Sequence, residues 1–351
     1  MDKETLSNYG WIVICVLVLA VMIALATPFG SFVSEAVQST TKGLFDVNKS
    51  ALDSTGLINI NNQEFGSNNK NDIEELPAFN PTLNPDDGTT PTNGSVYKYG
   101  NYEYRYNQRF ISSSWRTNTS QNGWGVRCIN NVADPGPILE SINGEPITDI
   151  SYAFAFCSYL TVAPTIPRTV TCMNYAFVEC ESLEVAPKIP NGVTTMLQTF
   201  GSCKNLKRYV GSNVADGDFS KYVIPETVTD MRYTFEKCAS LTISPIIPSN
   251  VTDVRYMFSG CSSLVNAPII PDKVIYMDYA FQNCTSLVTA PVIPSSVTTI
   301  KETFKDCTSL SGTITINTTP SSYSNCLKNT NITEVLGSCA NNIKTNILAT
   351  K

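Results

Sequence analysis

One sequence pattern recurs seven times between residues 151 and 310, and it constrains the fold more than any other feature of the chain. Each copy has a phenylalanine, a cysteine three residues later and a leucine three residues after that. In the first six copies, an Ile-Pro pair and a Val-x-x-Met or related apolar pair then follow. The phenylalanines are Phe154, Phe177, Phe200, Phe235, Phe258, Phe281 and Phe304, and the cysteines are Cys157, Cys180, Cys203, Cys238, Cys261, Cys284 and Cys307.

The spacing of these cysteines identifies the copies as units of one stack. Successive gaps are 23, 23, 35, 23, 23 and 23 residues, so one unit carries a 12-residue insertion near residues 207–222. A fixed period of this length is typical of a repeat solenoid, in which each unit buries its apolar face against its neighbours. We therefore predict a leucine-rich-repeat-like solenoid of mixed short β and α elements over residues 151–310. At a coil spacing of ~4.8 Å, the stack would be roughly 29 Å long.

The spacing within one unit predicts its local structure. Met277, Ala280, Phe281 and Cys284 stand at positions i, i+3, i+4 and i+7, which predicts a short helix or helical turn. Residues 287–294 are extended, but their two prolines cannot donate to a β-ladder. We expect a short ladder of about three residues per coil there, and the start of a second ladder after Val297.

The seven repeat cysteines are expected to form a buried column of free thiols. Cysteines of an exported chain usually form disulfides, which is the alternative. However, stacked coils would place the Cβ vectors in parallel rather than toward one another, and seven is an odd number. A free cysteine is a small apolar side chain that suits a crowded column. The chain has no C-x-x-C spacing, so we predict no metal site.

The repeat resembles a known family. Phe-x-x-Cys-x-x-Leu with Ile-Pro and Val-Thr-x-Met or Val-Thr-x-Ile, at a period of 23 residues, is similar to the BspA-type leucine-rich repeats of bacterial and protist surface proteins. The resemblance covers about residues 151–310. It departs from the family at Ala-Pro-x-Ile-Pro, as in residues 290–294, and at the insertion. The resemblance implies a role in adhesion to host or microbial surfaces.

The N-terminus predicts the location of the protein. No charged residue occurs between Glu4 and Glu35, and Trp11 to Ala26 is uninterrupted apolar sequence. We predict a cytoplasmic tip at 1–8, a single membrane-spanning anchor at 9–33 and an extracellular remainder. Cleaved secretion after Ala26 is the alternative. Apolar residues continue at helical spacing over 29–45, which predicts a juxtamembrane amphipathic helix at 34–58 and a segment able to mediate oligomerisation.

The rest of the chain is expected to form a spacer and two caps. Residues 59–95 are rich in Asn, Pro, Thr and Gly and predict a flexible linker. Residues 96–150 predict an aromatic β-rich cap over the first coil, with a hairpin that turns at Gly100-Asn101 and further strands near Trp115 and Trp124. Glycan binding by these aromatic side chains is the alternative. Residues 311–351 predict a C-terminal cap, in which strands 312–316 and 332–336 pair and Ser338 caps a last helix.

Composition excludes several classes of function. The chain has no histidine, which excludes histidine-based catalysis and metal sites, and its net charge of −6 argues against a nucleic-acid partner. Asp216 and Asp218 in the insertion could form a glycosidase or calcium site, but a simple loop is expected. We therefore predict a non-enzymatic protein with no catalytic residue, cofactor or metal.

The leading functional hypothesis is a membrane-anchored surface protein whose solenoid binds a protein or a glycan on another surface. The alternative is a pilus-like or fibre subunit that assembles through its N-terminal apolar helix. The sequence does not identify the ligand-contacting residues. Solvent-facing positions such as Asp278, Tyr279, Lys301 and Glu302 vary between units, which is compatible with binding and equally with neutral drift.

Overall fold

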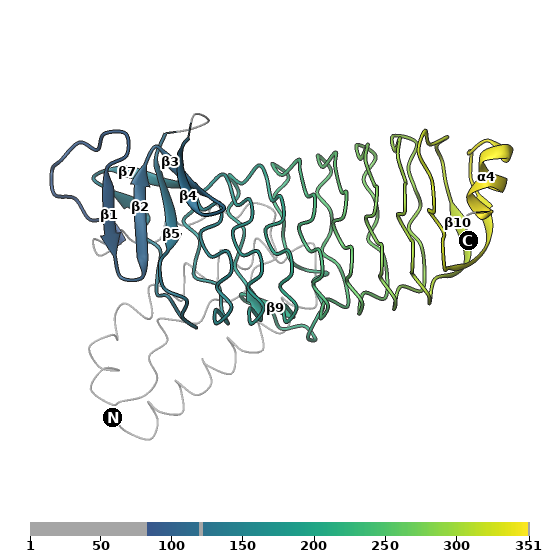
Figure 1. The fold of residues 1–351 in the computed structure, drawn as a ribbon, viewed down its shortest axis with the longest axis horizontal. Coiled ribbons are helices and arrows are strands. Elements are labelled where there is room, and N and C mark those ends of the chain that lie inside the picture. The colour runs from purple at the N-terminus through teal and green to yellow at the C-terminus, as the bar shows by residue number, and fades with distance from the viewer. Residues whose placement is uncertain (1–82, 119–121, 350–351) are drawn as a thin grey trace, which may run out of the picture. The chain divides into compact units, whose positions relative to one another are not determined.

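The computed structural model describes residues 83–118 and 122–349, which belong to one compact unit, Leu76–Lys351 (Figure 1). The predicted tip at 1–8, anchor at 9–33, cleavage site at Ala26, segment 29–45, helix at 34–58 and linker residues 59–82 lie outside these residues. Within the described ranges, no helix is both long and apolar enough to cross a membrane.

An N-terminal cap precedes the solenoid. Its five-stranded sheet has the order β1 (Val96–Tyr99), β2 (Tyr102–Tyr106), β5 (Trp124–Cys128), β7 (Glu145–Asp149) and β6 (Ser141–Ile142), and β3 (Gln108–Ile111) and β4 (Ser114–Thr117) form a separate hairpin. β1 and β2 pair antiparallel around Gly100-Asn101, which confirms the predicted hairpin. β7 runs into the stack, because Asp149 at its end bridges to Cys172 in the next coil.

Aromatic side chains join this cap to the first coil. Tyr102 is 1% exposed and meets Phe154 edge to face, with ring centroids 6.0 Å apart. The buried Trp124 donates its indole N–H to the carbonyl of Ile142 at 3.1 Å. The cap therefore shields the apolar end of the phenylalanine column from water.

The cap begins before residue 96. The carbonyls of Leu83 and Pro85 accept the N–H groups of Glu140 and Asn143, each at 2.8 Å. Leu83 also packs against the core. The expected linker therefore ends earlier than residue 95, since its described part from Leu83 onward is bonded to the cap. The Leu83 side chain and the two backbone hydrogen bonds hold this polar segment in place.

The helical turn predicted for each unit is wrong, because residues 278–283 form consecutive tight turns instead. Alternate N–H groups, those of Met277, Tyr279, Phe281 and Asn283, donate to carbonyls of the next coil at 2.9–3.1 Å. The intervening N–H groups close turns within the unit, such as Ala280 to Met277 at 3.1 Å. A helix would direct all of these bonds along its own chain. The alternation instead bonds each coil to its neighbour.

The ladders predicted on either side of the prolines are shorter than expected. In most coils they shrink to single-residue parallel bridges, such as Asn266 to Thr289 and Tyr276 to Thr299. Among the described coils before Leu310, only the pair β8 (Val185–Ala186) and β9 (Arg208–Tyr209) extends to two residues. Since the prolines at the corners of each unit lack an N–H, they limit how far a ladder can run.

The phenylalanines and cysteines form two parallel columns in the core. Neighbouring phenylalanine rings stack with centroids 5.0–5.8 Å apart. All eleven cysteines in the described part of the chain are free and buried. Six of the repeat thiols donate a hydrogen bond to the phenylalanine carbonyl of the preceding coil. These bonds run from Cys180, Cys203, Cys238, Cys261, Cys284 and Cys307 at 2.9–3.2 Å.

The insertion contributes to the core as well as to the surface. Phe219 and Tyr222 are 0% and 4% exposed, and the ring of Phe219 packs against Phe235 with centroids 6.2 Å apart. The hydroxyl of Tyr222 donates to the carbonyl of Pro187 at 2.7 Å. The outer part of the same loop is exposed, as at Val210.

The C-terminal cap closes the other end of the stack. β10 (Ser311–Thr315) and β11 (Asn331–Leu336) pair in parallel, which confirms the predicted strand pair. The last helix is α4 (Asn341–Leu348), but Ser338 does not cap it. The N-cap is Ala340, which makes no side-chain cap bond. The helix begins two residues later than predicted, and the buried Ile347 secures it instead of a cap.

Candidate binding faces of the solenoid

The two aspartates of the insertion serve the loop itself. Asp216 Oδ1 lies 3.6 Å from Arg208 Nε. Asp218 Oδ1 accepts the N–H of Ser220 at 2.8 Å, and the hydrogen bonds from Ser220 lower the pKa of the Asp218 carboxyl. Within residues 83–118 and 122–349, no group of three or more Cys, Asp or Glu side chains could hold a metal ion.

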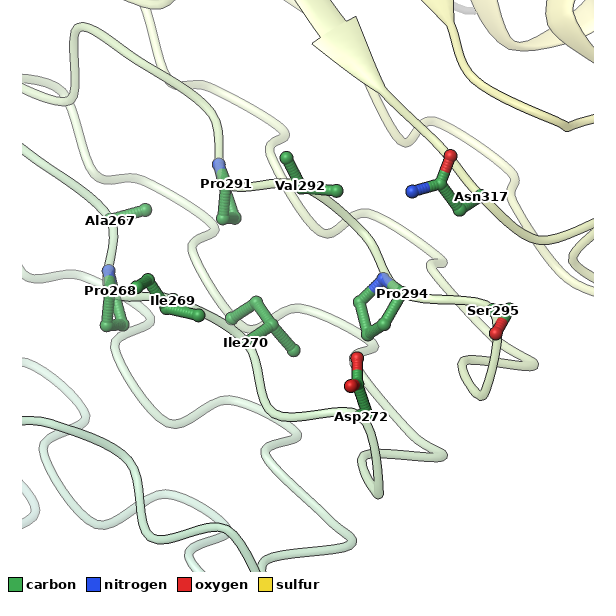
Figure 2. A pocket seen from close by; sticks show the side chains of 10 residues that line it. All are labelled: Ala267, Pro268, Ile269, Ile270, Asp272, Pro291, Val292, Pro294, Ser295 and Asn317. Carbon is green, nitrogen blue, oxygen red and sulfur yellow. The ribbon is translucent and has the colours of Figure 1, made fainter.

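One outer face carries an apolar ridge. We give this name to Val223, Ile246, Ile269 and Val292, which occupy the same position in four consecutive coils and are 73%, 74%, 89% and 54% exposed. Figure 2 shows Ile269 next to Pro268, and Val292 between Pro291 and Pro294. A groove of about 510 Å³ runs between these two coils, and Asp272 is the charged side chain in its lining.

A second face carries a column of tyrosines. We call Tyr152, Tyr175, Tyr233, Tyr256 and Tyr279 the tyrosine column, because they share one position of the repeat. Neighbouring rings stack in parallel, with centroids 4.4–4.5 Å apart and planes within 10°. Gln198 takes this position in the third coil and separates the two stacks. The rings therefore form a pair and a triplet of half-buried phenols.

The backbone of the tyrosine column adopts left-handed conformations. The five tyrosines have φ values of 55–60°, which are costly for a residue with a side chain. The coils can hold this conformation because each N–H bonds to the next coil, as from Tyr279 to the carbonyl of Lys301 at 2.9 Å. Burial and the neighbouring tyrosines raise the pKa of Tyr256 to about 12. The Tyr256 phenol is thus a neutral hydrogen-bonding group at physiological pH.

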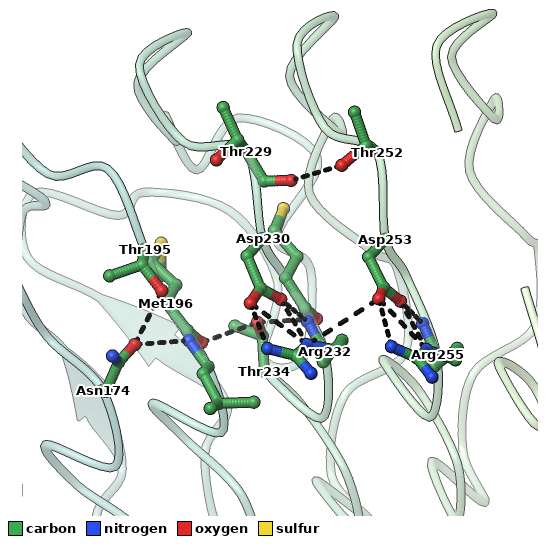
Figure 3. A network of polar contacts seen from close by, with 12 residues as sticks. Asn174, Thr195, Met196, Thr229, Asp230, Arg232, Thr234, Thr252, Asp253 and Arg255 are labelled. Carbon is green, nitrogen blue, oxygen red and sulfur yellow. Dashed lines mark hydrogen bonds and ion pairs between the residues drawn. The ribbon is translucent and has the colours of Figure 1, made fainter. Parts of the chain in front are cut away.

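Charged side chains run beside the tyrosine column. We call Asp230, Arg232, Asp253 and Arg255 the charged row (Figure 3). Each arginine pairs with the aspartate two residues before it at 2.6 Å, and Arg232 also reaches Asp253 of the next coil at 3.8 Å. The row ends with the guanidinium of Arg255 over the ring of Tyr276, 5.1 Å from its centroid. The two arginine side chains remain about one third exposed.

The pattern of the charged row continues in neighbouring coils with other side chains. Asn174 Oδ1 accepts the hydroxyl of Thr195 at 2.8 Å (Figure 3). Asp278 accepts the N–H of Lys301 at 2.8 Å, and the Lys301 ammonium lies 5.5 Å from the ring centroid of Tyr279. The face therefore presents phenols, guanidinium groups and an ammonium in one continuous strip.

The structure separates structural residues from surface residues. The predicted phenylalanine and cysteine positions lie in the core and cannot contact a partner. The solvent-facing positions Asp278, Tyr279 and Lys301 come together beside the charged row, and Glu302 pairs with Lys305 at 2.9 Å.

Sequence reasoning missed the charged row and the apolar ridge. The signals were present as Thr-Asp-x-Arg in two consecutive units and as a β-branched residue before Ile-Pro in four consecutive units.

The fold and these faces define a leucine-rich-repeat solenoid protein. The family model of the BspA type leucine-rich repeat region matches residues 140–216 and 218–350 in six copies, which is more than half of the chain. The chain therefore belongs to the BspA-type leucine-rich-repeat proteins, a family typically found on bacterial surfaces. No curated protein matches the sequence.

Solved structures of bacterial leucine-rich-repeat proteins are similar to this chain. A leucine-rich-repeat protein of Treponema pallidum is 18% identical, with a TM-score of 0.36, and the match covers 65% of this chain and 88% of that one. One from Bacteroides ovatus is also 18% identical, with a TM-score of 0.35 and coverage of 66% and 77%. A leucine-rich cell surface protein of Faecalibacterium prausnitzii is 17% identical, with a TM-score of 0.22 and coverage of 74% and 99%.

Proposed function

We propose that the protein is a non-enzymatic, membrane-anchored cell-surface protein that binds a partner through the tyrosine column and the charged row. Family membership supports the surface location. The apolar segment at 9–33 supports membrane attachment as a single-pass anchor. The partner is a protein or a glycan on another surface, as expected for adhesion.

The strip of stacked tyrosines beside partly exposed arginines carries the proposal. Tyrosine and arginine are enriched in protein interfaces and dominate their hot spots. Stacking and the bonds between coils already fix the tyrosine rings, so binding would cost little side-chain entropy. The strip is thus organised before a partner arrives.

The stacking favours a protein partner over a glycan. A sugar ring binds to an open aromatic face. Within each stack of the tyrosine column, the ring faces cover one another at 4.4–4.5 Å, and Lys301 lies over Tyr279 at the end of the triplet. Ring edges and hydroxyl groups remain for contact, and these suit the peptide groups and mixed side chains of a protein surface.

Surface display can be tested on intact cells that produce the full chain. Brief protease treatment should release peptides from residues 151–310, which mass spectrometry would identify. If lysed cells yield these peptides and intact cells do not, the proposed location is wrong.

Binding can be tested with the same cells against arrays of matrix proteins and glycans. The double variant Arg255→Ala, Tyr256→Ala should weaken binding at least ~10-fold, as expected for hot-spot residues. Thr289→Ala changes an exposed side chain outside the tyrosine column and the charged row, at the bridge to Asn266; it is the control and should leave binding unchanged. Equal binding by the double variant and the wild type would contradict the assignment of this face.

A further inference from the structure

Two cysteines meet where the N-terminal cap joins the stack. Cys128 is the last residue of β5, and its N–H donates to the carbonyl of Ala153 in the first coil at 2.8 Å. Cys157 is the first repeat cysteine and lies four residues further along that coil. Tyr102, which is paired with Cys128 in the sheet, contacts the ring of Phe154 in the same coil. A hydrogen bond joins the two thiols across this junction.

Cys157 differs from the other repeat cysteines because no coil precedes it. The other six thiols each donate to a phenylalanine carbonyl of the preceding coil, as from Cys180 to Phe154 at 3.0 Å. The cap takes the place of that coil for Cys157 and offers the sulfur of Cys128 instead. Cys128 and Cys157 are 9% and 7% exposed, whereas the other six repeat cysteines are 0% exposed. A small reagent can therefore reach this pair more easily than the rest of the column.

The geometry that disfavours disulfides inside the column does not apply to this pair. Stacked coils place the Cβ vectors of neighbouring cysteines in parallel rather than toward one another. Cys128 lies outside the repeat, on a strand of the cap sheet that is antiparallel to β2. Its side chain is therefore free of the parallel register of the coils, and its thiol contacts that of Cys157.

We propose that Cys128 and Cys157 are a modification site, at which a small-molecule disulfide converts the two thiols into a disulfide bond between the cap and the first coil. Disulfides form and persist in oxidising environments outside the cytosol. The bond would join positions 29 residues apart and hold the cap over Phe154, at the end of the phenylalanine column. The inference goes beyond the proposed function and depends on it only for the source of the oxidant in cells.

The contact between the thiols assigns the order of the two steps. Their hydrogen bond lowers the pKa of Cys128 and raises that of Cys157, so Cys128 forms the thiolate more readily. After losing its proton to water, Cys128 attacks one sulfur of the reagent, whose S–S bond breaks and releases a first thiolate.

The second step closes the protein disulfide. The released thiolate takes the proton of Cys157, and the Cys157 sulfur attacks Cys128 and releases a second thiolate, which takes a proton from water. The two protein thiols together lose two electrons and two protons. One reagent disulfide gains them and becomes two thiols, so the exchange is balanced.

Exchange with oxidised glutathione tests the pair in the full chain, purified in detergent and reduced beforehand. After incubation at about pH 8, free thiols are blocked with iodoacetamide in denaturant, and the digested chain is measured by mass spectrometry without reduction. The peptide that contains Cys128 should be linked to the peptide that contains Cys157. Cys172 is the matched control position, because it is also 9% exposed and lies close to the cap, at the bridge to Asp149. It should remain a free thiol.

Serine variants separate the two steps. Cys157→Ser removes the second thiol, so Cys128 should accumulate as a mixed disulfide with glutathione. Cys128→Ser removes the attacking thiol, so Cys157 should be modified at least ~10-fold more slowly than Cys128 is in Cys157→Ser. Circular dichroism would verify that both variants fold. The linkage in the wild type decides the proposal if either variant does not fold.

Thermal unfolding measures what the bond does for the cap. The oxidised wild type should have a Tm at least about 5 °C above that of the reduced wild type, since the bond restricts the unfolded chain. Glutathione treatment of Cys157→Ser should give no such increase. An equal or lower Tm of the oxidised wild type would contradict the proposed role in holding the cap.

Two results of the exchange would overturn the proposal. One is a folded wild type in which Cys128 and Cys157 remain free thiols or carry only glutathione. The other is linkage of either cysteine to a third one, such as Cys180. Both are measured on purified protein, so neither bears on the surface location, which protease treatment of intact cells tests separately.

Discussion

At the scale of single residues, the cysteine column shows why this repeat uses cysteine. The thiol is small enough for the column, and it also satisfies a carbonyl of the preceding coil, as from Cys261 to Phe235 at 3.0 Å. Alanine would fit but could not donate. The sequence predicted the free thiols from spacing and parity, but it contains no signal for the hydrogen bond, which depends on the relative position of two coils.

The repeat thiols should resist modification in the folded protein. Burial raises the pKa of Cys203, Cys238 and Cys284 well above the ordinary value of 9.0, so very little thiolate forms near pH 8. We expect iodoacetamide to leave these cysteines unlabelled in native buffer and to label them fully in denaturant, as measured by mass spectrometry. Labelling in native buffer at the rate of a free cysteine would show that the column opens.

Asp149 should make the folded protein less stable as the pH rises. Burial, partly offset by hydrogen bonds from Ser151 and by Arg109, raises the pKa of this carboxyl above its ordinary value of 3.8. The folded state therefore holds the proton more tightly than the unfolded state. The resulting stability is complete below pH ~4 and is lost as the pH rises through the folded pKa. Asp149→Asn keeps an acceptor for the Ser151 N–H and does not titrate.

This prediction is measured by urea unfolding from pH 4 to pH 7. The free energy of unfolding of the wild type, minus that of Asp149→Asn, should decrease as the pH increases. Asp218→Asn is the matched control with the opposite sign, because hydrogen bonds from Ser220 lower the pKa of the half-buried Asp218. A wild-type advantage over Asp149→Asn that grows with pH would contradict the assignment.

At the scale of elements, the wrong helix prediction has a physical cause. The spacing i, i+3, i+4 and i+7 marks one face of a helix, but a run of tight turns buries the same positions. The two structures differ in where the N–H groups go, and this depends on the neighbouring coil. The run of turns requires left-handed backbone at Tyr279 and Asn283. Neither residue is a glycine, the residue type from which a left-handed conformation can be predicted.

The insertion should matter to stability through its inner residues. Phe219→Ala should lower the free energy of unfolding by about 3 kcal/mol or more, because it leaves a cavity beside Phe235. Val210→Ala in the same loop is the control and should change it by less than about 0.5 kcal/mol, since Val210 is exposed. Denaturant unfolding of both variants checks this. Equal effects of the two substitutions would mean that the loop does not contribute to the core, as expected for a simple surface insertion.

At the scale of the whole molecule, the order of elements follows from the sequence, but the binding faces do not. The period of 23 residues fixes how many coils there are and which side chains fill the core. The faces arise from outward positions that the period leaves unconstrained. The apolar ridge and the charged row leave a signal in the sequence, but the period alone does not say that such residues face solvent, as Val223, Ile246 and Ile269 do in the structure.

The stack should depend on its C-terminal cap, because every coil exposes apolar surface to the next. Residues after Leu310 cover Phe304 and Leu310, both 0% exposed. A chain that ends at Leu310 should aggregate, since the last coil would present these side chains to water.

A chain that ends at Ala340 keeps β10 and β11 and loses only α4. It should remain soluble and be destabilised by about 2 kcal/mol, the value of burying one isoleucine such as Ile347. Size-exclusion chromatography and thermal unfolding of the two truncated chains separate these outcomes. A soluble, cooperatively folded chain that ends at Leu310 would contradict this role for the cap, because the last coil would then tolerate an exposed apolar end.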